Sequence, residues 1–281
     1  VAAGLVGGSV IPFIFITLMG FFNNKIENVY EIEKGIKIPV FDGIMSHKYK
    51  VKLPVINHPR SGIAESFRGL KTNINTLLDK TGAKVITINS LVPGEGKSFI
   101  SSNLAAVVSK GNKRVLLIGA DLHKPTLHNY LGIEESFGLV DYLKDEKKIE
   151  DIISSTSIPN LFFMQTGLTT DNPSDLLDNK KFELLLEKSR AMFDYVIIDN
   201  APLLLVPDAI LISQFADIVL FILRINFSHK GQIKEINKIV EFNKIGLSAV
   251  VINSTPESGY AYGYGSRKKY WKKGYGEFKS K

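Results

Sequence analysis

Residues 85–110 read VITINSLVPGEGKSFISSNLAAVVSK, and this stretch decides the fold. A short apolar run at Val85–Ile88 predicts a strand, Pro93–Ser98 forms a glycine-containing loop, and a helix is expected from Ser98 to about Lys110. Strand, glycine loop and helix in this order are the context of a phosphate-binding loop. The sequence therefore predicts the nucleotide-binding core of an α/β protein.

Each part of the loop has a predicted task. Gly94 and Gly96 let backbone N–H groups turn toward phosphate oxygens, and the start of the following helix adds positive partial charge. Lys97 is expected to reach the β- and γ-phosphates, and the Ser98 hydroxyl to ligate Mg²⁺. We therefore expect ATP and Mg²⁺ as ligands. The predicted nucleotide-binding residues are Pro93, Gly94, Glu95, Gly96, Lys97, Ser98 and Phe99.

Further apolar runs follow downstream, and they are continuous rather than alternating. Such runs are typical of parallel strands that are buried on both faces. Helical segments between them predict a doubly wound, mostly parallel sheet of the P-loop NTPase type. The predicted strands lie at 85–88, 115–118, 161–164, 195–198, 218–223 and 249–252, and the helices at 63–78, 98–110, 181–191 and 230–243.

Two aspartates stand at the ends of these strands. Asp199 ends a buried run, where a carboxylate holds magnesium in P-loop proteins; the alternative is a helix N-cap. Asp121 follows another run and is expected where strand ends converge. Arg224 also follows a strand, but we interpret it as a surface arginine. The predicted catalytic residues are Lys97, Asp121 and Asp199, and the predicted metal ligands are Ser98 and Asp199.

Composition separates the two ends of the chain from its body. The 281 residues are 44% hydrophobic and include no cysteine, which excludes disulfides and thiolate metal sites. The first 24 residues carry no charge, and residues 1–22 are long and apolar enough to span a membrane, with a buried core helix as the alternative. Residues 259–281 hold seven of the basic residues against one acid, although the whole chain is only +7.

The basic tail also holds a cluster of tyrosines. They lie among glycine, serine and lysine, so they cannot form a core and are expected to be flexible. One interpretation is a set of phosphate acceptors, because a mobile tyrosine can enter another molecule's active site. The alternatives are stacking on RNA bases and contact with lipid headgroups. The tyrosines are Tyr260, Tyr262, Tyr264, Tyr270 and Tyr275.

The helix at 63–78 carries a charged row ahead of the core. Glu65, Arg68 and Lys71 are spaced three residues apart. Taken alone, such a row indicates a solvated helix face.

The order of these parts resembles the bacterial tyrosine kinases (BY-kinases) of the polysaccharide co-polymerase type. The resemblance covers nearly the whole chain and depends on several motifs together rather than on the loop alone. The matching pieces are ESFRGLK at 65–71, PGEGKS at 93–98, DLHKP at 121–125, NPSDLL at 172–177 and the strand ending at Asp199.

The resemblance implies an activity and a set of partners. Such a protein transfers the γ-phosphoryl group of ATP to tail tyrosines of a neighbouring subunit, and Glu65, Arg68 and Lys71 would lie at the interface of a ring-shaped homo-oligomer. It implies polysaccharide polymerase and export components, a tyrosine phosphatase and the bacterial inner membrane as partners, with the kinase domain in the cytoplasm and no nucleic acid. The implied parts are a transmembrane helix (1–22), a juxtamembrane linker that partly packs on the domain (23–60), a kinase domain (61–256) and the tail (257–281).

The chain departs from the family pattern beside the expected magnesium. The family's second motif begins with two aspartates, but Gly119 stands at the first of these positions and His123 replaces an arginine. Slower catalysis is therefore expected. Two alternatives stay open: a weakly active, ATP-gated assembly module of the export machinery, and a membrane-tethered positioning ATPase. Val92, where such ATPases carry an extra lysine, argues against the second.

Overall fold

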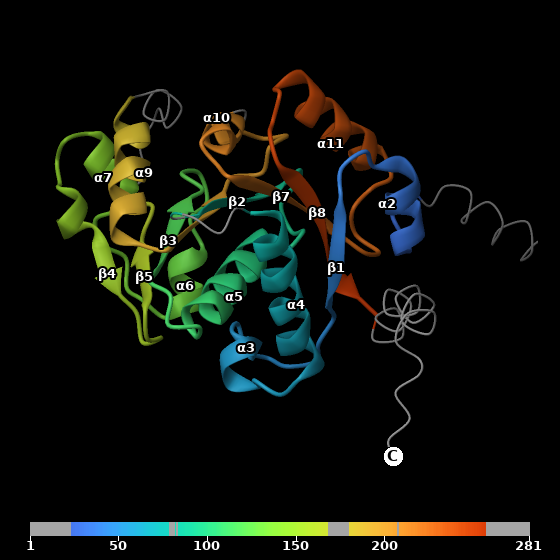
Figure 1. The fold of residues 1–281 in the computed structure, drawn as a ribbon, viewed down its shortest axis with the longest axis horizontal. Coiled ribbons are helices and arrows are strands. Elements are labelled where there is room, and N and C mark those ends of the chain that lie inside the picture. Colours follow the sequence, from blue (N-terminus) through green and yellow to red (C-terminus); the bar gives the residue numbers. More distant parts are fainter. Residues whose placement is uncertain (1–23, 79–81, 83, 168–179, 207, 257–281) are drawn as a thin grey trace, which may run out of the picture.

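A single eight-stranded sheet forms the centre of the computed structural model, which describes residues 24–78, 82, 84–167, 180–206 and 208–256 (Figure 1). The strand order is β1-β8-β7-β2-β6-β3-β5-β4, and only the β4–β5 pair is antiparallel. The strands are β1 (Val40–Met45), β2 (Lys84–Ser90), β3 (Val115–Ala120), β4 (Ile153–Ser155), β5 (Leu161–Met164), β6 (Tyr195–Asn200), β7 (Ile218–Arg224) and β8 (Ser248–Thr255).

Helices cover both faces of the sheet (Figure 1). On one face, α4 and α5 pack over the central strands, and on the other, α7, α9 and α10 cover one half while α2 and α11 cover the other half. The helices are α2 (Val29–Gly35), α3 (Pro54–Asn57), α4 (Gly62–Leu77), α5 (Lys97–Ser109), α6 (Leu127–Leu131), α7 (Leu139–Leu143), α9 (Lys180–Met192), α10 (Asp208–Gln214) and α11 (Gly231–Phe242), with a 3₁₀ turn at Ile149–Asp151.

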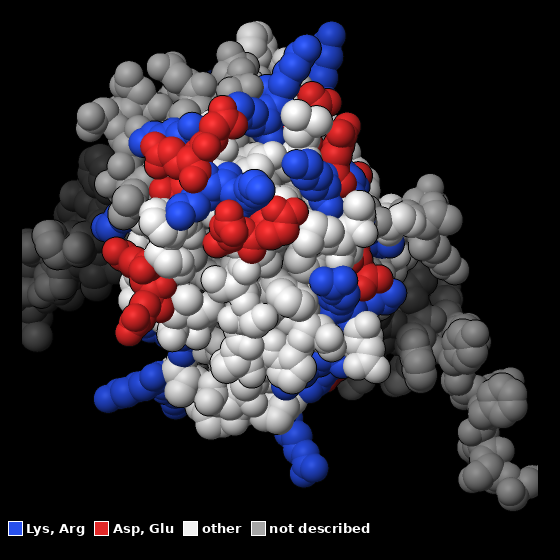
Figure 2. All heavy atoms as spheres, turned by 90° about the vertical axis from the view of Figure 1, so that its left-hand side faces the viewer, with Lys and Arg blue, Asp and Glu red and all other residues white. Residues whose placement is uncertain are grey.

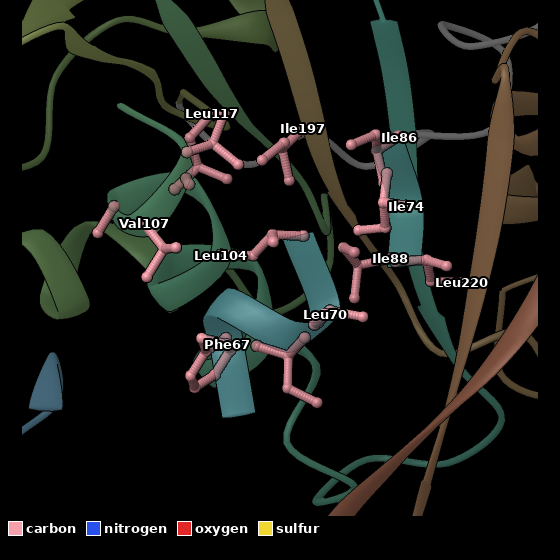
Figure 3. Packing of buried hydrophobic residues seen from close by; sticks show 14 of the residues in the cluster. Phe67, Leu70, Ile74, Ile86, Ile88, Leu104, Val107, Leu117, Ile197 and Leu220 are labelled. Carbon is pink, nitrogen blue, oxygen red and sulfur yellow. The ribbon is translucent and has the colours of Figure 1, made fainter. Parts of the chain in front are cut away.

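The core beneath α4 and α5 fixes the position of the phosphate loop. Ser61 caps α4 by accepting a hydrogen bond from the Ala64 N–H, which satisfies a free donor of the first turn. Figure 3 shows the apolar face of α4 against the strands and α5. Burying such side chains stabilises the layer by roughly 1.5–3 kcal/mol each. The labelled residues are Phe67, Leu70, Ile74, Ile86, Ile88, Leu104, Val107, Leu117, Ile197 and Leu220.

The six predicted strands and four predicted helices are all present, and the sheet is mostly parallel and covered on both faces, as predicted. Two strands had no expectation. β4 is three residues long and pairs antiparallel at an edge. β1 pairs with β8 at the other edge, and its pairing register shifts twice. Neither of these two edge strands has the continuous apolar run that predicts a central strand.

The folded unit begins before residue 61, where the sequence placed the end of a linker. β1 joins the main sheet, and Ile26 and Ile32 are fully buried against α11 and the strands of that half. Asn28 caps α2 by accepting a hydrogen bond from the Glu31 N–H. The described part of 23–60 is therefore an integral part of the α/β domain.

The two ends of the chain lie outside the described residues. This applies to the predicted membrane helix at 1–22 and to the tyrosine tail at 257–281. Within the part that the structure describes, no helix is both long and apolar enough to cross a membrane.

The face at the β4 edge carries acidic and basic side chains interspersed rather than a continuous basic surface (Figure 2).

Candidate active site

The phosphate loop joins β2 to α5 in a conformation that requires glycine. Gly94 and Gly96 have φ angles of +91° and +96°, in the left-handed region that other residues rarely adopt. A Cβ atom on Gly96 would lie 2.0 Å from Nδ2 of Asn253, which itself donates to the Glu95 carbonyl at 2.8 Å. The loop is therefore closed around its second glycine by β8.

Four predicted residues converge at the loop. Lys97 Nζ lies 3.2 Å from Asp199 Oδ1 and 3.7 Å from Asp121 Oδ2. The Ser98 hydroxyl donates to Asp199 Oδ2 at 2.7 Å. Parallel pairing produces this convergence, because Asp199 on β6 is in register with Ile88 on β2 and Gly119 on β3.

The charges in this group are strongly buried. The side chains of Lys97, Asp121 and Asp199 are 8%, 13% and 3% exposed. Burial raises the pKa of the Asp199 carboxyl, and the Lys97 charge and the Ser98 hydrogen bond oppose that rise. The ammonium therefore compensates two carboxylates in a site of low dielectric.

A cavity of about 840 Å³ opens over this group, which is within the range of small-molecule sites. Its walls come from the loop, from the β3–α6 connection (His123, Lys124), from α6 (Tyr130), from the segment after β1 (His47) and from the end of β8. Burial raises the pKa of Tyr130, and the negative charge of Asp199 adds to the effect. Asp121 accepts a hydrogen bond from the Lys124 N–H at 3.0 Å, which orients its carboxylate toward Lys97.

The predicted nucleotide residues divide into two groups. Six of them line the cavity, and the side chain of Glu95 does not. Its carboxylate is fully buried and accepts hydrogen bonds from Leu91, Val92, Ser228 and Gln232. The six lining residues are Pro93, Gly94, Gly96, Lys97, Ser98 and Phe99.

Several residues of the site carried no useful sequence signal. Arg224, expected to be an ordinary surface arginine, donates to the Gly94 carbonyl at 2.9 Å and lies over the Phe227 ring at 5.4 Å. Asn253, at the end of β8, bonds the loop from the same side. Their place after a strand was the only available hint, because strand ends meet at one edge of a parallel sheet.

The oxygen atoms beside the loop suit a magnesium ion. Ser98 and Asp199 offer a hydroxyl and a carboxylate 2.7 Å apart. Mg²⁺ prefers such hard oxygen donors and is held by one or two carboxylates together with substrate phosphates. Within the described residues no group of three or more His, Asp or Glu side chains is arranged to hold a metal.

The charged row on α4 is only partly a row in three dimensions. Glu65 and Arg68 are exposed and form an ion pair, and Arg68 also donates to the Pro59 carbonyl. Lys71 is half-buried, and its Nζ lies 2.9 Å from where a Cβ on Gly111 would stand. Burial lowers the pKa of Lys71. A helix turns by about 100° per residue, so Lys71, six positions after Glu65, points in a different direction from Glu65.

The family of the chain follows from comparison with known proteins. Residues 83–248 match the model of a family described as "AAA domain". Tyrosine-protein kinase YwqD from Bacillus subtilis (strain 168) is 31% identical over 210 residues, which cover 74% of this chain and 89% of that protein. Tyrosine-protein kinase ptk from Acinetobacter johnsonii is 32% identical over 260 residues, which cover 87% of this chain but 35% of the relative.

A solved structure agrees with these relatives. The BceF tyrosine kinase domain has a TM-score of 0.76 and 29% sequence identity, and the match covers 83% of this chain and 100% of that one. The chain spans about a third of the length of several curated relatives. The matched AAA domain, these relatives and the strand–loop–helix site all agree. The chain therefore belongs to the bacterial tyrosine-protein kinases.

Proposed function

We propose that this chain is an ATP-dependent protein-tyrosine kinase that phosphorylates tyrosines in the C-terminal tail of a neighbouring copy. The observation that carries the proposal is the convergence of Lys97, Ser98, Asp121 and Asp199 under a cavity of about 840 Å³. Phosphoryl transfer depends on positioning and on neutralising charge, and this group offers both.

The residues around the loop have distinct roles in this proposal. The loop N–H groups and Lys97 bind the β- and γ-phosphates, and Ser98 and Asp199 hold Mg²⁺. The metal, when bound, neutralises charge that develops on the phosphate oxygens. Asp121, at the cavity wall, accepts the proton of the acceptor hydroxyl while the phenol oxygen bonds to phosphorus and ADP leaves.

The proposed acceptors are the five tail tyrosines, Tyr260 to Tyr275, which lie outside the described residues. Each phosphate would add about −1.5 to −2 charges to a basic segment. That change is expected to release the tail from its partner copy and to loosen a ring-shaped oligomer. We place such cycling at the bacterial inner membrane, with the domain in the cytoplasm, where it would regulate capsule or exopolysaccharide polymerisation and export and be reversed by a tyrosine phosphatase.

The mass of the intact protein tests the activity. The full chain, purified in mild detergent from cells without tyrosine phosphatases, should carry phosphate increments that map to Tyr260–Tyr275. Lys97→Met should carry none, because it removes the charge beside Asp121 and Asp199. A parent chain that binds ATP–Mg²⁺ and stays unmodified after incubation with it would contradict the kinase proposal.

The assembly proposal places Glu65 and Arg68 at the subunit contact, since both are exposed on α4. Arg68→Ala should shift the sedimentation of the chain from the oligomer toward the monomer. Lys188→Ala, which removes an exposed cation on α9, is the control and should leave the oligomer intact. An unchanged Arg68→Ala oligomer would exclude this contact.

One observation favours a second candidate, the weakly active ATP-gated assembly module. Gly119 stands where the family has its first aspartate, and a Cβ there would lie 3.1 Å from Thr166 Oγ1. Thr166 donates to the Gly119 carbonyl at 3.0 Å, so the site is packed around glycine. Gly119→Asp in a Thr166→Ala background, which removes the close oxygen, should raise the phosphorylation rate above that of Thr166→Ala alone. An equal rate would mean that the missing aspartate is not what limits catalysis.

A further inference from the structure

The Glu95 carboxylate lies in the phosphate loop yet faces away from the cavity. It is 0% exposed, and its Oε2 atom accepts hydrogen bonds from the backbone N–H groups of Leu91 at 2.8 Å and Val92 at 3.2 Å. These are the residues that lead from β2 into the loop. The side chain therefore folds the start of the loop back onto its own middle.

The other oxygen, Oε1, reaches the connection between β7 and α11 and the first turn of α11. It accepts hydrogen bonds from the Ser228 hydroxyl and from Gln232 Nε2, the latter at 3.0 Å. The Gln232 amide cannot turn around, because its oxygen accepts the His229 N–H at 2.6 Å. Two backbone N–H groups and this amide are thus fixed donors, and a carboxylate is the side chain that can accept from all of them.

The four partners of this carboxylate are all neutral donors. Burial raises the pKa of Glu95, and the four hydrogen bonds oppose that rise. A buried carboxylate without a cationic partner is costly unless its oxygens are fully bonded, so the arrangement demands a specific loop conformation. Two further bonds reinforce it, from Arg224 to the Gly94 carbonyl and from Asn253 to the Glu95 carbonyl.

We propose that Glu95 is the positioning residue of the phosphate loop: its carboxylate gathers two donors from the segment that follows β2, one from the β7–α11 connection and one from α11, and thereby holds the loop N–H groups in the geometry that binds nucleotide phosphates. This inference rests on the proposed nucleotide site. Glu95 does not contact the nucleotide; it acts through the loop backbone.

The proposal predicts what an isosteric change does. Glu95→Gln keeps the shape but turns one acceptor into an NH₂ group that faces a fixed donor. A buried donor without an acceptor is worth roughly a 10- to 100-fold change in an equilibrium, so ATP–Mg²⁺ affinity should fall by about that factor. Because Glu95 does not touch the reacting atoms, the phosphorylation rate at saturating ATP should stay within about 3-fold of the parent.

An exchange of the two side chains separates positioning from general damage. In Glu95→Gln with Gln232→Glu, the new amide at 95 donates to the new carboxylate at 232, which still accepts the His229 N–H. Gln232→Glu alone brings two carboxylates together and should also weaken binding. The double variant should therefore recover at least about 10-fold in affinity relative to either single one. Glu241→Gln is the matched control, because that carboxylate is exposed and bonds only to the exposed Lys37 within the described contacts.

Titration with a fluorescent ATP analogue in the presence of Mg²⁺, on the full chain in detergent, measures these affinities, and thermal unfolding without nucleotide checks the fold. If Glu95→Gln folds and binds like the parent, or the exchange restores nothing, the positioning role is excluded. If Glu95→Gln does not fold, Ser228→Ala removes one donor and decides: affinity a few-fold lower supports the proposal, and unchanged affinity overturns it. If the parent chain bound no nucleotide, just as the Lys97→Met variant is expected to bind none, that result would instead contradict the proposed function itself.

Discussion

Two buried carboxylates lie at the phosphate loop, one beside it and one within it, and they are held in different ways. Asp199 comes from β6, on one side of β2, and is paired with the Lys97 ammonium and the Ser98 hydroxyl. Glu95 is bonded by neutral donors alone, two from the start of the loop and two from Ser228 and Gln232, which follow β7 on the other side of β2. Burial raises the pKa of both groups. The comparison teaches that a buried carboxylate can be compensated in two ways, by a neighbouring ammonium charge at Asp199 or by a full set of neutral hydrogen-bond donors at Glu95.

The largest expected effect comes from breaking the first arrangement. Asp199→Asn should lower the phosphorylation rate at saturating ATP by at least about 100-fold, since metal-held charge stabilisation is worth several kcal/mol. The free energy of unfolding should change little, because the neutral amide is easier to bury and Lys97 keeps Asp121 at 3.7 Å. Rate and chemical denaturation measured on one preparation check both parts.

Asp194→Asn is the control for that variant. Asp194 directly precedes β6, but its side chain is 37% exposed and pairs with Lys113, so its phosphorylation rate should match the parent. If Asp199→Asn kept more than a tenth of the parent rate, Asp199 would have no special part in holding the metal.

The next effect concerns Gly96, the second glycine of the loop, which directly follows Glu95. Gly96→Ala should lower the free energy of unfolding by about 1–3 kcal/mol, the usual cost of an unfavourable left-handed backbone, and abolish tight ATP binding because its Cβ would meet Asn253 at 2.0 Å. Gly132→Ala has a φ of +66° and open space around its Cβ position, so it measures the backbone cost alone. Equal losses of ATP binding in the two variants would mean that the contact with Asn253 is unimportant.

A smaller effect is expected at Arg224, which tightens the second arrangement. Arg224→Lys loses the bond to the Gly94 carbonyl and the contact with Phe227, which together should weaken ATP binding by about 3- to 10-fold. Arg114→Lys is the matched control, because Arg114 also lies over aromatic rings, Phe162 and Phe193, but at the amino end of β3, whereas the site lies at the carboxyl end. Equal ATP affinities of the two variants would mean that Arg224 does not contribute to ATP binding.

The smallest expected effect is on the pH dependence of stability. The pKa of Asp199 is raised from 3.8, so the folded chain binds this proton more tightly than the unfolded chain. The free energy of unfolding therefore falls as pH rises from that value through the raised pKa. Asp199→Asn lacks this fall, so the small difference in unfolding free energy between the variant and the parent should shift in favour of the variant as pH rises.

Asp194→Asn should change in the opposite direction. The hydrogen bond from Lys113 lowers the pKa of Asp194, so that carboxylate stabilises the chain above its unfolded pKa and loses the effect as pH falls. Denaturation curves at several pH values should therefore give slopes of opposite sign for two aspartates of one strand region. Slopes of the same sign would contradict the assigned environment of Asp199.

The sequence by itself predicted the central strands and the residues that converge at the phosphate loop. Continuous apolar runs predict strands that are buried on both faces, and the loop PGEGKS between a strand and a helix predicts its chemistry from local backbone requirements. Asp121 and Asp199 were predictable because parallel strands bring their carboxyl ends to one edge whatever their exact order. Local sequence patterns, together with the rule that parallel strands end at one edge of the sheet, are sufficient for these features.

Tertiary structure alone decided how the loop is held. Glu95 bonds to Ser228 and Gln232, more than 130 positions away, and Asn253 is more distant still. Such partners are defined only when the order β8-β7-β2-β6 places them around β2. For the same reason β1 carried too weak a pattern to be recognised, since its pairing with β8 depends on a strand at the opposite end of the chain. Hydrogen-bond partners that are distant in sequence leave no local pattern, because distance and angle select them only in the folded sheet.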